Sequence, residues 1–365
     1  MSWLLAFAGF AVLIILHELG HFVAAKAVGM RVERFSLFFP PLLARVRRGE
    51  TEYAVGAVPL GGYVKITGMN PAEEIPPEVA HRAYFRQPVW KRIIVIAAGP
   101  FVNVVIAFGI FAALAWANGV TEPPARVGSV QPGKPAEGKL RPGDAILAVD
   151  GQRVTGSTLQ DQQRQIIDRI AAHHCSGTPA DGCRTAEPVR LLVARGGSER
   201  TVEIRPFYDA AEKRTRLGYV PAGTHREVGA GRAAEISVDR MWFITKGTVE
   251  TIAGVFDAEK REQISGVVGS YEVTRQYFEF SFSDAMIILG VISLSLGVIN
   301  LFPFLPLDGG HIFWALAEKV RGRAIPFSVM ERAGFVGFVL VITLFVIGFT
   351  NDIGRLTGEG FNVPR

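Results

Sequence analysis

The chain has 365 residues, of which 49% are hydrophobic and 20% are charged, below the about 25% usual in soluble domains. This composition excludes a disordered, collagen-like or coiled-coil protein. It also argues against an ordinary soluble enzyme, because the apolar residues are clustered. The net charge is +5, but no basic stripe is interleaved with aromatic residues, so we expect no nucleic acid among the partners. We attribute the excess of Lys and Arg to membrane topology.

Four stretches of the chain contain no Asp, Glu, Lys or Arg: Ser2–Leu16, Ile93–Thr121, Ala285–Leu307 and Ala333–Asn351. A membrane-spanning helix needs about 20 mostly apolar residues. The first stretch reaches that length only if it continues through a polar cluster to Ala25. The sequence therefore predicts four spans in contact with the lipid bilayer: Trp3–Ala25, Trp90–Asn118, Ala285–Asn300 and Gly334–Gly348.

Positive charge between the spans predicts their orientation. The segment Lys26–Arg92 carries eleven Lys and Arg against six Asp and Glu, and the connection Glu318–Arg332 is also basic. Both segments are expected to be cytoplasmic. The two termini and the long segment Glu122–Asp284 would then lie outside the cytoplasm, and the alternative is the inverted orientation. The N-terminus lacks the basic start of a secretory signal peptide.

The cytoplasmic segment is predicted to contain β structure. Met30–Gly68 alternates in polarity, with a turn at Arg47–Glu50 and an interruption at Gly61-Gly62. Asn70–Gln87 is polar and contains prolines, which predicts a surface loop.

The outer segment is predicted to hold a small α+β domain over Pro123–Phe207, with a helix at Leu159–Ala172. Asp209–Ala234 is expected to be a linker, and Ile236–Phe256 a helix against the membrane surface or the bundle. The predicted fold is thus a mainly α membrane protein with four transmembrane helices, a cytoplasmic β-hairpin region and one extracytoplasmic α+β domain. Its expected parts are residues 1–118 and 285–365 as the membrane core, 123–207 as the domain, and 208–284 as linker and membrane-surface helices.

The residues His17-Glu18-Leu19-Gly20-His21 match H-E-x-x-H within the first span. Two His one helical turn apart face the same side and can bind one Zn²⁺, while Glu18 is placed to act as general base on a zinc-bound water. Ionisable residues inside a membrane span are candidates for function because they are costly there. The alternative is a polar cluster that only packs helices together.

Asp308 is the best candidate for a third protein ligand, because it is the only carboxylate at the end of the third span. His17 lies about 22 Å along its helix, in the cytoplasmic half of the membrane, and Asp308 reaches a similar depth. Pro303 and Pro306 break the helix before Asp308, which is tolerated where protein or a cavity satisfies the backbone. The alternatives are an ordinary helix-end carboxylate and, as a weaker ligand, His311.

These motifs resemble those of the site-2 protease family of intramembrane zinc metalloproteases. The matching runs follow the family order: His17–His21, Pro59–Val64, Ala98–Asn103 and Asn300–Gly310. The resemblance implies that His17, His21 and Asp308 bind one zinc ion per chain, that Glu18 is the base, and that Asn300 helps to position the substrate. It also implies a location in the bacterial cytoplasmic membrane.

Further substrate contacts are expected along the β structure and the second span. Gly61, Gly62 and Tyr63 could offer a sheet edge that holds an unwound substrate strand, whereas the alternative is a self-contained hairpin. Asn103 could contact the substrate or hydrogen-bond between helices.

Leu140–Gly151 resembles the PDZ domain of the family, which could bind a peptide C-terminus or filter substrates by bulk. The chain departs from the family in having one PDZ-like unit where some relatives have two, and in Val267 where Pro is usual.

The two cysteines, Cys175 and Cys183, are expected to form a local disulfide outside the cytoplasm. The alternative is a second metal site that would use His173 and His174.

The leading functional interpretation is a zinc endopeptidase that cuts single-span membrane proteins within the transmembrane segment. Site-2 relatives typically cut anti-sigma factors already trimmed by another protease, and some clear remnant signal peptides. Two other classes remain: a non-catalytic PDZ scaffold with a vestigial zinc site, and a transporter. The intact Glu18 argues against the first, and the lack of repeat symmetry argues against the second.

Overall fold

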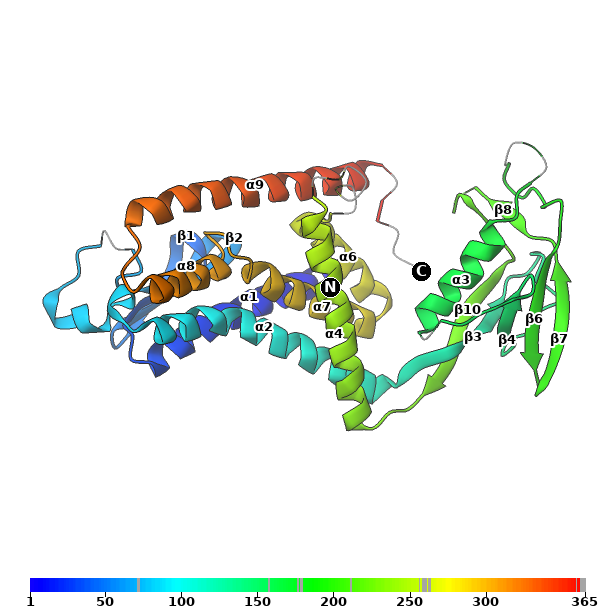
Figure 1. Ribbon diagram of the computed structural model, residues 1–365, viewed down its shortest axis with the longest axis horizontal. Coiled ribbons are helices and arrows are strands. Elements are labelled where there is room, and N and C mark those ends of the chain that lie inside the picture. The colour runs from blue at the N-terminus through cyan, green and yellow to red at the C-terminus, as the bar shows by residue number, and fades with distance from the viewer. Residues whose placement is uncertain are drawn as a thin grey trace. The chain divides into compact units, whose positions relative to one another are not determined.

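The computed structural model describes the chain except for residues 71, 72, 157, 176, 178, 179, 211, 256, 258–260, 262, 263, 359 and 362–365. It forms two compact units (Figure 1). Unit 1 comprises residues 1–114 and 231–365, and unit 2 comprises residues 115–230.

Four helices are long and apolar enough to cross a membrane: α1 (Ser2–Ala27), α2 (Val89–Asn118), α7 (Phe282–Asn300) and α9 (Phe327–Thr357). Each predicted span lies within one of them, so the prediction of four long apolar helices at these places is confirmed. The last helix is much longer than expected, because it continues past Asp352 and Arg355, where charge had marked the end of the span.

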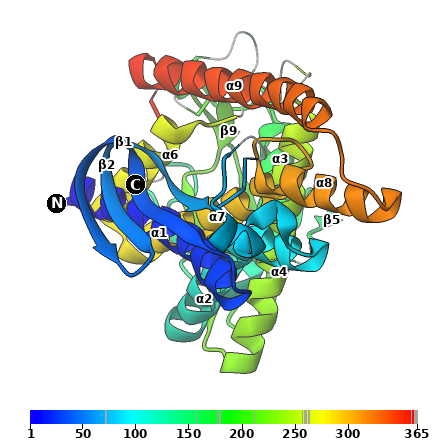
Figure 2. The same cartoon turned by 90° about the vertical axis from the view of Figure 1, so that its left-hand side faces the viewer.

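The β structure of unit 1 is one long hairpin of β1 (Val32–Arg48) and β2 (Thr51–Ile66), which lies beside α1 (Figure 2). The turn falls where it was predicted, with Gly49 at a φ of 60°. At Gly61-Gly62 the strand β2 continues, but its pairing with β1 is interrupted as expected: between the pairs Leu37–Gly62 and Phe39–Val58, β2 has two more residues than β1. Between the pairs Phe39–Val58 and Ala44–Val55, β1 in turn has two more residues than β2.

The segment after the hairpin is not the surface loop that its polar composition predicted. It forms two short 3₁₀ helices, η1 (Pro77–Arg82) and η2 (Tyr84–Arg86). Tyr84 is only 2% exposed and joins a hydrophobic cluster with Ile66 and Val95. A few apolar residues therefore anchor this otherwise polar segment against α2.

The described part of unit 1 contains three further α-helices: α4 (Ala230–Ala253), α6 (Val267–Phe280) and α8 (Asp308–Arg321). Met241 and Ile244 of α4 pack on the cluster of Ala107, Phe111 and Leu294, so α4 packs against the bundle as predicted. Phe256, the expected end of that helix, lies outside the described residues.

A buried carboxylate joins α9 to α6. The Asp352 side chain is fully buried and accepts hydrogen bonds from the backbone N–H groups of Gly266 and Gly269 and from the Ser265 hydroxyl. It thus satisfies donors at the start of α6 that would otherwise lack partners. The glycines are needed because a Cβ on Gly269 would lie 2.3 Å from an Asp352 oxygen.

We expect Asp352→Ala to lower the free energy of unfolding by about 2–4 kcal/mol, because it leaves buried donors unpaired. Thermal unfolding of the detergent-solubilised protein would measure this. Thr350→Ala is a suitable control, since its hydroxyl bonds only to Val346 of its own helix. Equal melting temperatures for the two variants would show that the Asp352 contacts add no stability.

Unit 2 is an antiparallel sheet in the order β10-β3-β4-β6-β7 with the helix α3 packed against it (Figure 1). Its core includes Ile166 and Ile170 of the helix and Leu191 and Val193 of the sheet. The elements are β3 (Val120–Val130), β4 (Ala145–Val149), β5 (Gln152–Arg153), α3 (Leu159–Ala171), β6 (Val189–Arg195), β7 (Ser198–Ile204), β8 (Phe207–Asp209), β9 (Arg214–Arg216) and β10 (Tyr219–Arg226).

The expected linker at Asp209–Ala234 is wrong over most of its length. Its charged start belongs to the small hairpin β8–β9, and β10 pairs with β3 at the edge of the main sheet. Charge and glycine suggested a linker, but Leu217 is 2% exposed within the core. The α+β unit therefore extends to Arg226, well beyond the predicted end at Phe207.

The predicted disulfide between Cys175 and Cys183 is confirmed. The neighbouring His173 instead pairs with Asp150, at 2.9 Å. No metal-ligand cluster among the described residues includes His173 or His174.

Candidate metal centre

Three side chains from two helices form the only cluster of metal-ligand groups in the described part of the chain: His17, His21 and Asp308. The two histidine Nε2 atoms are 3.3 Å apart, and each lies 3.4 Å from Oδ2 of Asp308. Ligand atoms about 2.0–2.1 Å from a tetrahedral zinc ion are about 3.3–3.4 Å from one another. The triangle therefore has the size that zinc requires.

The Asp308 oxygen supplies an independent sign of a missing positive partner. Oδ2 is buried and has no hydrogen-bond partner among the described residues. The two imidazoles, 3.4 Å away, can pair with this oxygen only when they are protonated, and a cation bound between the three groups would lower the cost of burying it. The three residues therefore fit a zinc ion.

Groups on α2 contact the Nδ1 atoms of both histidines and so orient the two rings. The His21 Nδ1 atom lies 2.8 Å from the Val95 carbonyl, to which it donates, and this leaves Nε2 free to bind a metal. The His17 Nδ1 atom lies 3.2 Å from the side-chain amide of Asn103, whose Oδ1 is buried and lacks a partner among the described residues. With that carbonyl oxygen turned toward His17, Nδ1 would donate to it and Nε2 would again be free.

Glycines allow α1 and α2 to approach each other at the site. A Cβ on Gly20 would lie 2.6 Å from the Ala98 carbonyl oxygen, and a Cβ on Gly99 would lie 2.2 Å from Nε2 of His21. Real Cβ atoms do not come closer than about 3 Å to such atoms. The backbone of α2 therefore forms one wall of the metal site.

A compact connection between α7 and α8 places Asp308 at the start of α8. The chain leaves α7 at Asn300 and reaches α8 over seven residues, 301–307, that include the two prolines. A Cβ on Gly309 would lie 2.2 Å from the Leu301 carbonyl oxygen, and one on Gly310 would lie 2.5 Å from the Leu305 nitrogen. The glycines after Asp308 therefore let α8 start directly against this connection.

The hairpin approaches the site at Glu18. A Cβ on Gly62 would lie 2.8 Å from Cγ of Glu18 and 3.0 Å from the Ser36 carbonyl oxygen. Glu18 is half-buried between α1 and β2. Its position beside the metal ligands and next to a strand suits a general base that acts on a bound peptide.

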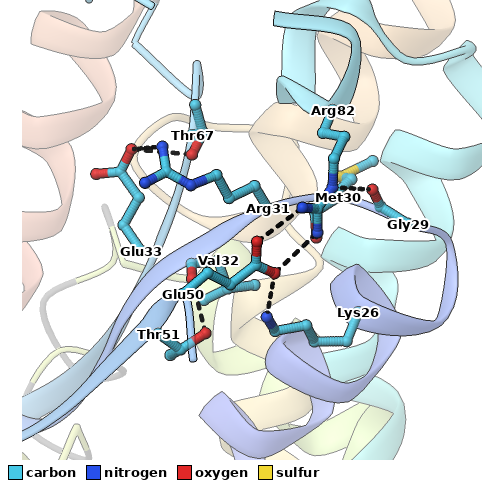
Figure 3. A network of polar contacts seen from close by, with 10 residues as sticks. All are labelled: Lys26, Gly29, Met30, Arg31, Val32, Glu33, Glu50, Thr51, Thr67 and Arg82. Carbon is cyan, nitrogen blue, oxygen red and sulfur yellow. Dashed lines mark hydrogen bonds and ion pairs between the residues drawn. The ribbon is translucent and has the colours of Figure 1, made fainter. Parts of the chain in front are cut away.

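A polar network ties the hairpin turn to the end of α1 (Figure 3). Glu50 binds Lys26 of α1 and Arg82 of η1, and the Arg82 Nη1 atom lies 2.7 Å from the Glu50 carboxylate. These two cations lower the pKa of Glu50 to about 2, with Arg82 the larger contributor. The carboxylate is therefore ionised at neutral pH, and the network holds the hairpin against the helix that carries both histidines.

The other predicted site residues do not belong to the cluster of ligands. Gly61 packs against Phe39, and Tyr63 stacks on the same ring. Asn103 is fully buried against His17, and Asn300 is the last residue of α7. His311 lies one turn after Asp308 in α8 and is not part of the cluster. Substrate contact by these residues stays a prediction.

Sequence reasoning missed the orienting role of the Val95 carbonyl and the wall formed by Gly99. A backbone carbonyl has no residue-type signal. Gly99 did have a sequence signal, because it lies in the Ala98–Asn103 run that matches the family. Its contact with the histidines could not be predicted, because it depends on how α2 crosses α1.

Comparison with known proteins agrees with this geometry. The model of peptidase family M50 matches residues 5–344. The chain belongs to this family. Similar proteins, each named "putative zinc metalloprotease", occur in Campylobacter jejuni (30% identical, covering 95% of this chain and 92% of the relative), Nostoc sp. (31%, 98% and 98%) and Clostridium perfringens (30%, 97% and 98%).

The resemblance to site-2 proteases is thereby confirmed over nearly the whole chain. Four spans, a His-His-Asp cluster and the family membership together describe a membrane zinc metalloprotease.

Proposed function

We propose that this M50 metalloprotease is an intramembrane endopeptidase that hydrolyses a peptide bond within the transmembrane segment of single-span membrane proteins. The observation that carries the proposal is the burial of His17 and His21 in an apolar helix that is long enough to span a membrane. The substrate class that we favour is an anti-sigma factor already trimmed by another protease, and remnant signal peptides are a second class.

The chemistry follows from the positions of the side chains. A zinc ion held by His17, His21 and Asp308 would supply an activated water and polarise the scissile carbonyl. Glu18 takes a proton from the attacking water and then delivers it to the leaving amide nitrogen. The Val95 carbonyl and Asn103 keep the imidazoles in the orientation that binds metal.

We assign to the β1–β2 hairpin the role of holding the scissile peptide bond at the metal site. A transmembrane substrate helix must unwind before a peptide bond can reach the site. Strand addition would hold it extended, because main-chain hydrogen bonds form along a sheet edge. Gly62 brings β2 into contact with Glu18, so a strand bound beside β2 would lie next to the base.

The zinc assignment predicts the behaviour of Asp308→Ala. Loss of one of three ligands should weaken zinc binding by more than the about 10- to 100-fold that loss of an outer partner costs. Metal content after dialysis against a chelator, measured beside wild type, checks this. Full zinc occupancy and full activity in the folded variant would remove Asp308 from the site.

We assign unit 2 to the outer face of the bacterial cytoplasmic membrane, together with both termini. The basic composition of residues 26–92 supports this orientation. We further propose that unit 2 is PDZ-like and restricts which substrates reach the site. In support, β10 is an edge strand of its sheet, and edge strands accept added peptide strands.

Removal of unit 2 tests that role. Val120 pairs with Arg226, so a short linker can replace residues 120–226 without separating the flanking ends. We expect this variant to keep its zinc and to cleave substrates that still carry a large outer domain, which wild type should reject. Cleavage assays with trimmed and untrimmed substrates would measure this preference. If the folded variant cuts neither, unit 2 is a required activator rather than a filter.

A non-catalytic PDZ scaffold with a vestigial zinc site is the second candidate function. It predicts zinc binding without turnover. Cleavage of a model membrane peptide by wild type, with Glu18→Gln as control, separates the two functions.

A further inference from the structure

The ligand Asp308 stands on a helix that apolar packing holds only weakly. Of the described residues of α8, only Gly309, Gly310 and Ala315 are fully buried, and all three are small. Of the larger apolar side chains, Phe313 is 48% and Val320 90% exposed, whereas Ile312 packs on the cluster that contains Tyr84 and Val95. A polar contact adds to this limited packing.

That contact is an ion pair at the far end of the helix. Arg92 of α2 is 2% exposed, and its Nη2 atom lies 2.7 Å from a carboxylate oxygen of Glu318. The guanidinium carbon also lies 6.0 Å from the centre of the Tyr84 ring and 5.7 Å from that of Phe85. Arginine suits this place because its planar group can stack on aromatic rings while it binds a carboxylate.

The residues of α2 that contact the histidines lie on one face of that helix, and Arg92 lies on the same face. Arg92, Val95, Gly99 and Asn103 follow one another at the spacing of a single helical face. Val95 binds His21, Gly99 contacts it, and Asn103 contacts His17. Arg92 is the residue on this face that binds α8.

We propose that Arg92 and Glu318 are positioning residues: their ion pair, between a buried guanidinium and a half-buried carboxylate, aligns α8 with α2 and so sets where Asp308 meets His17 and His21. Glu318 lies about 15 Å along the helix from Asp308, so a change in the direction of α8 at Glu318 would also shift Asp308. The connection of residues 301–307 holds one end, and Arg92 holds the other. The inference rests on the zinc site of the proposed function.

The test uses zinc affinity of the full chain in detergent, measured by chelator competition, for Arg92→Met, Glu318→Gln and the charge swap of both residues. We expect each single variant to bind Zn²⁺ about 10- to 100-fold more weakly, and the swap to recover part of the loss. Absorption of the Co²⁺-loaded protein should change in the single variants, because it reports ligand geometry. For cleavage, kcat should fall while KM changes little.

A matched control separates positioning from general stability. Glu272 and Arg275 form a similar partly buried pair within α6, at 2.6 Å, and do not reach the metal site. Glu272→Gln should keep the affinity and the Co²⁺ spectrum of wild type. If Arg92→Met does not fold, the isosteric Glu318→Gln decides the matter.

The outcomes distinguish this inference from the function beneath it. A wild-type chain that binds no zinc overturns the proposed function. A wild-type chain that binds zinc, with folded single variants of equal affinity and spectrum, overturns only the role of Arg92 and Glu318.

Discussion

Glu18→Gln is expected to retain zinc and to lose hydrolysis. The amide preserves the shape and packing of the side chain against Gly62, so the three ligands should remain in place. It cannot accept the proton of the attacking water, and loss of a general base typically costs about 10²–10⁴-fold in rate. Zinc content by atomic absorption and turnover of a model transmembrane peptide would measure the two effects separately.

An exposed carboxylate supplies the control for this substitution. Glu250 lies on α4, its side chain is 65% exposed, and it makes only a long ion pair with Lys246. Glu250→Gln should leave both zinc and turnover unchanged. Near-native turnover in Glu18→Gln would defeat the assignment of Glu18 as base, whatever its zinc content.

Sequence patterns predicted the parts of the site that depend on local spacing. The His17 and His21 pair follows from helical periodicity, and Asp308 followed from charge at a span end. The four spans were found for the same reason, since lipid requires long apolar segments. The end of α9 was misplaced because Asp352, a charged residue, is buried against α6 through a contact between distant segments.

Features that depend on tertiary pairing were not predictable from composition. The polar stretch around Tyr84 is anchored by burial of a few apolar side chains, and β10 joins a sheet through pairing with β3. Both segments are rich in residues that local rules assign to loops. Likewise Arg92 reads as one more basic residue flanking a span, and only the fold shows that Glu318 meets it.

Gly99→Ala is expected to abolish zinc binding and hence hydrolysis. The added Cβ would lie 2.2 Å from Nε2 of His21, the atom that faces the metal, and 2.9 Å from Cε1 of His17. The His21 ring cannot easily turn aside, because its Nδ1 is bonded to the Val95 carbonyl. Relief requires α1 to move away from α2, which would open the triangle of ligand atoms. Metal analysis and peptide cleavage would record the loss.

The same helix offers a matched control for this substitution. Gly109 also lies in α2, and a Cβ there would meet nothing within 4 Å. Gly109→Ala should keep zinc and activity, and it should stabilise the helix by up to about 1 kcal/mol, because alanine is the better helix former. A difference between the two variants therefore isolates the contact with His21 from any general effect of replacing a glycine. If folded Gly99→Ala binds zinc as wild type does, α1 and α2 do not meet at this glycine. The backbone of α2 at Gly99 would then not form a wall of the metal site.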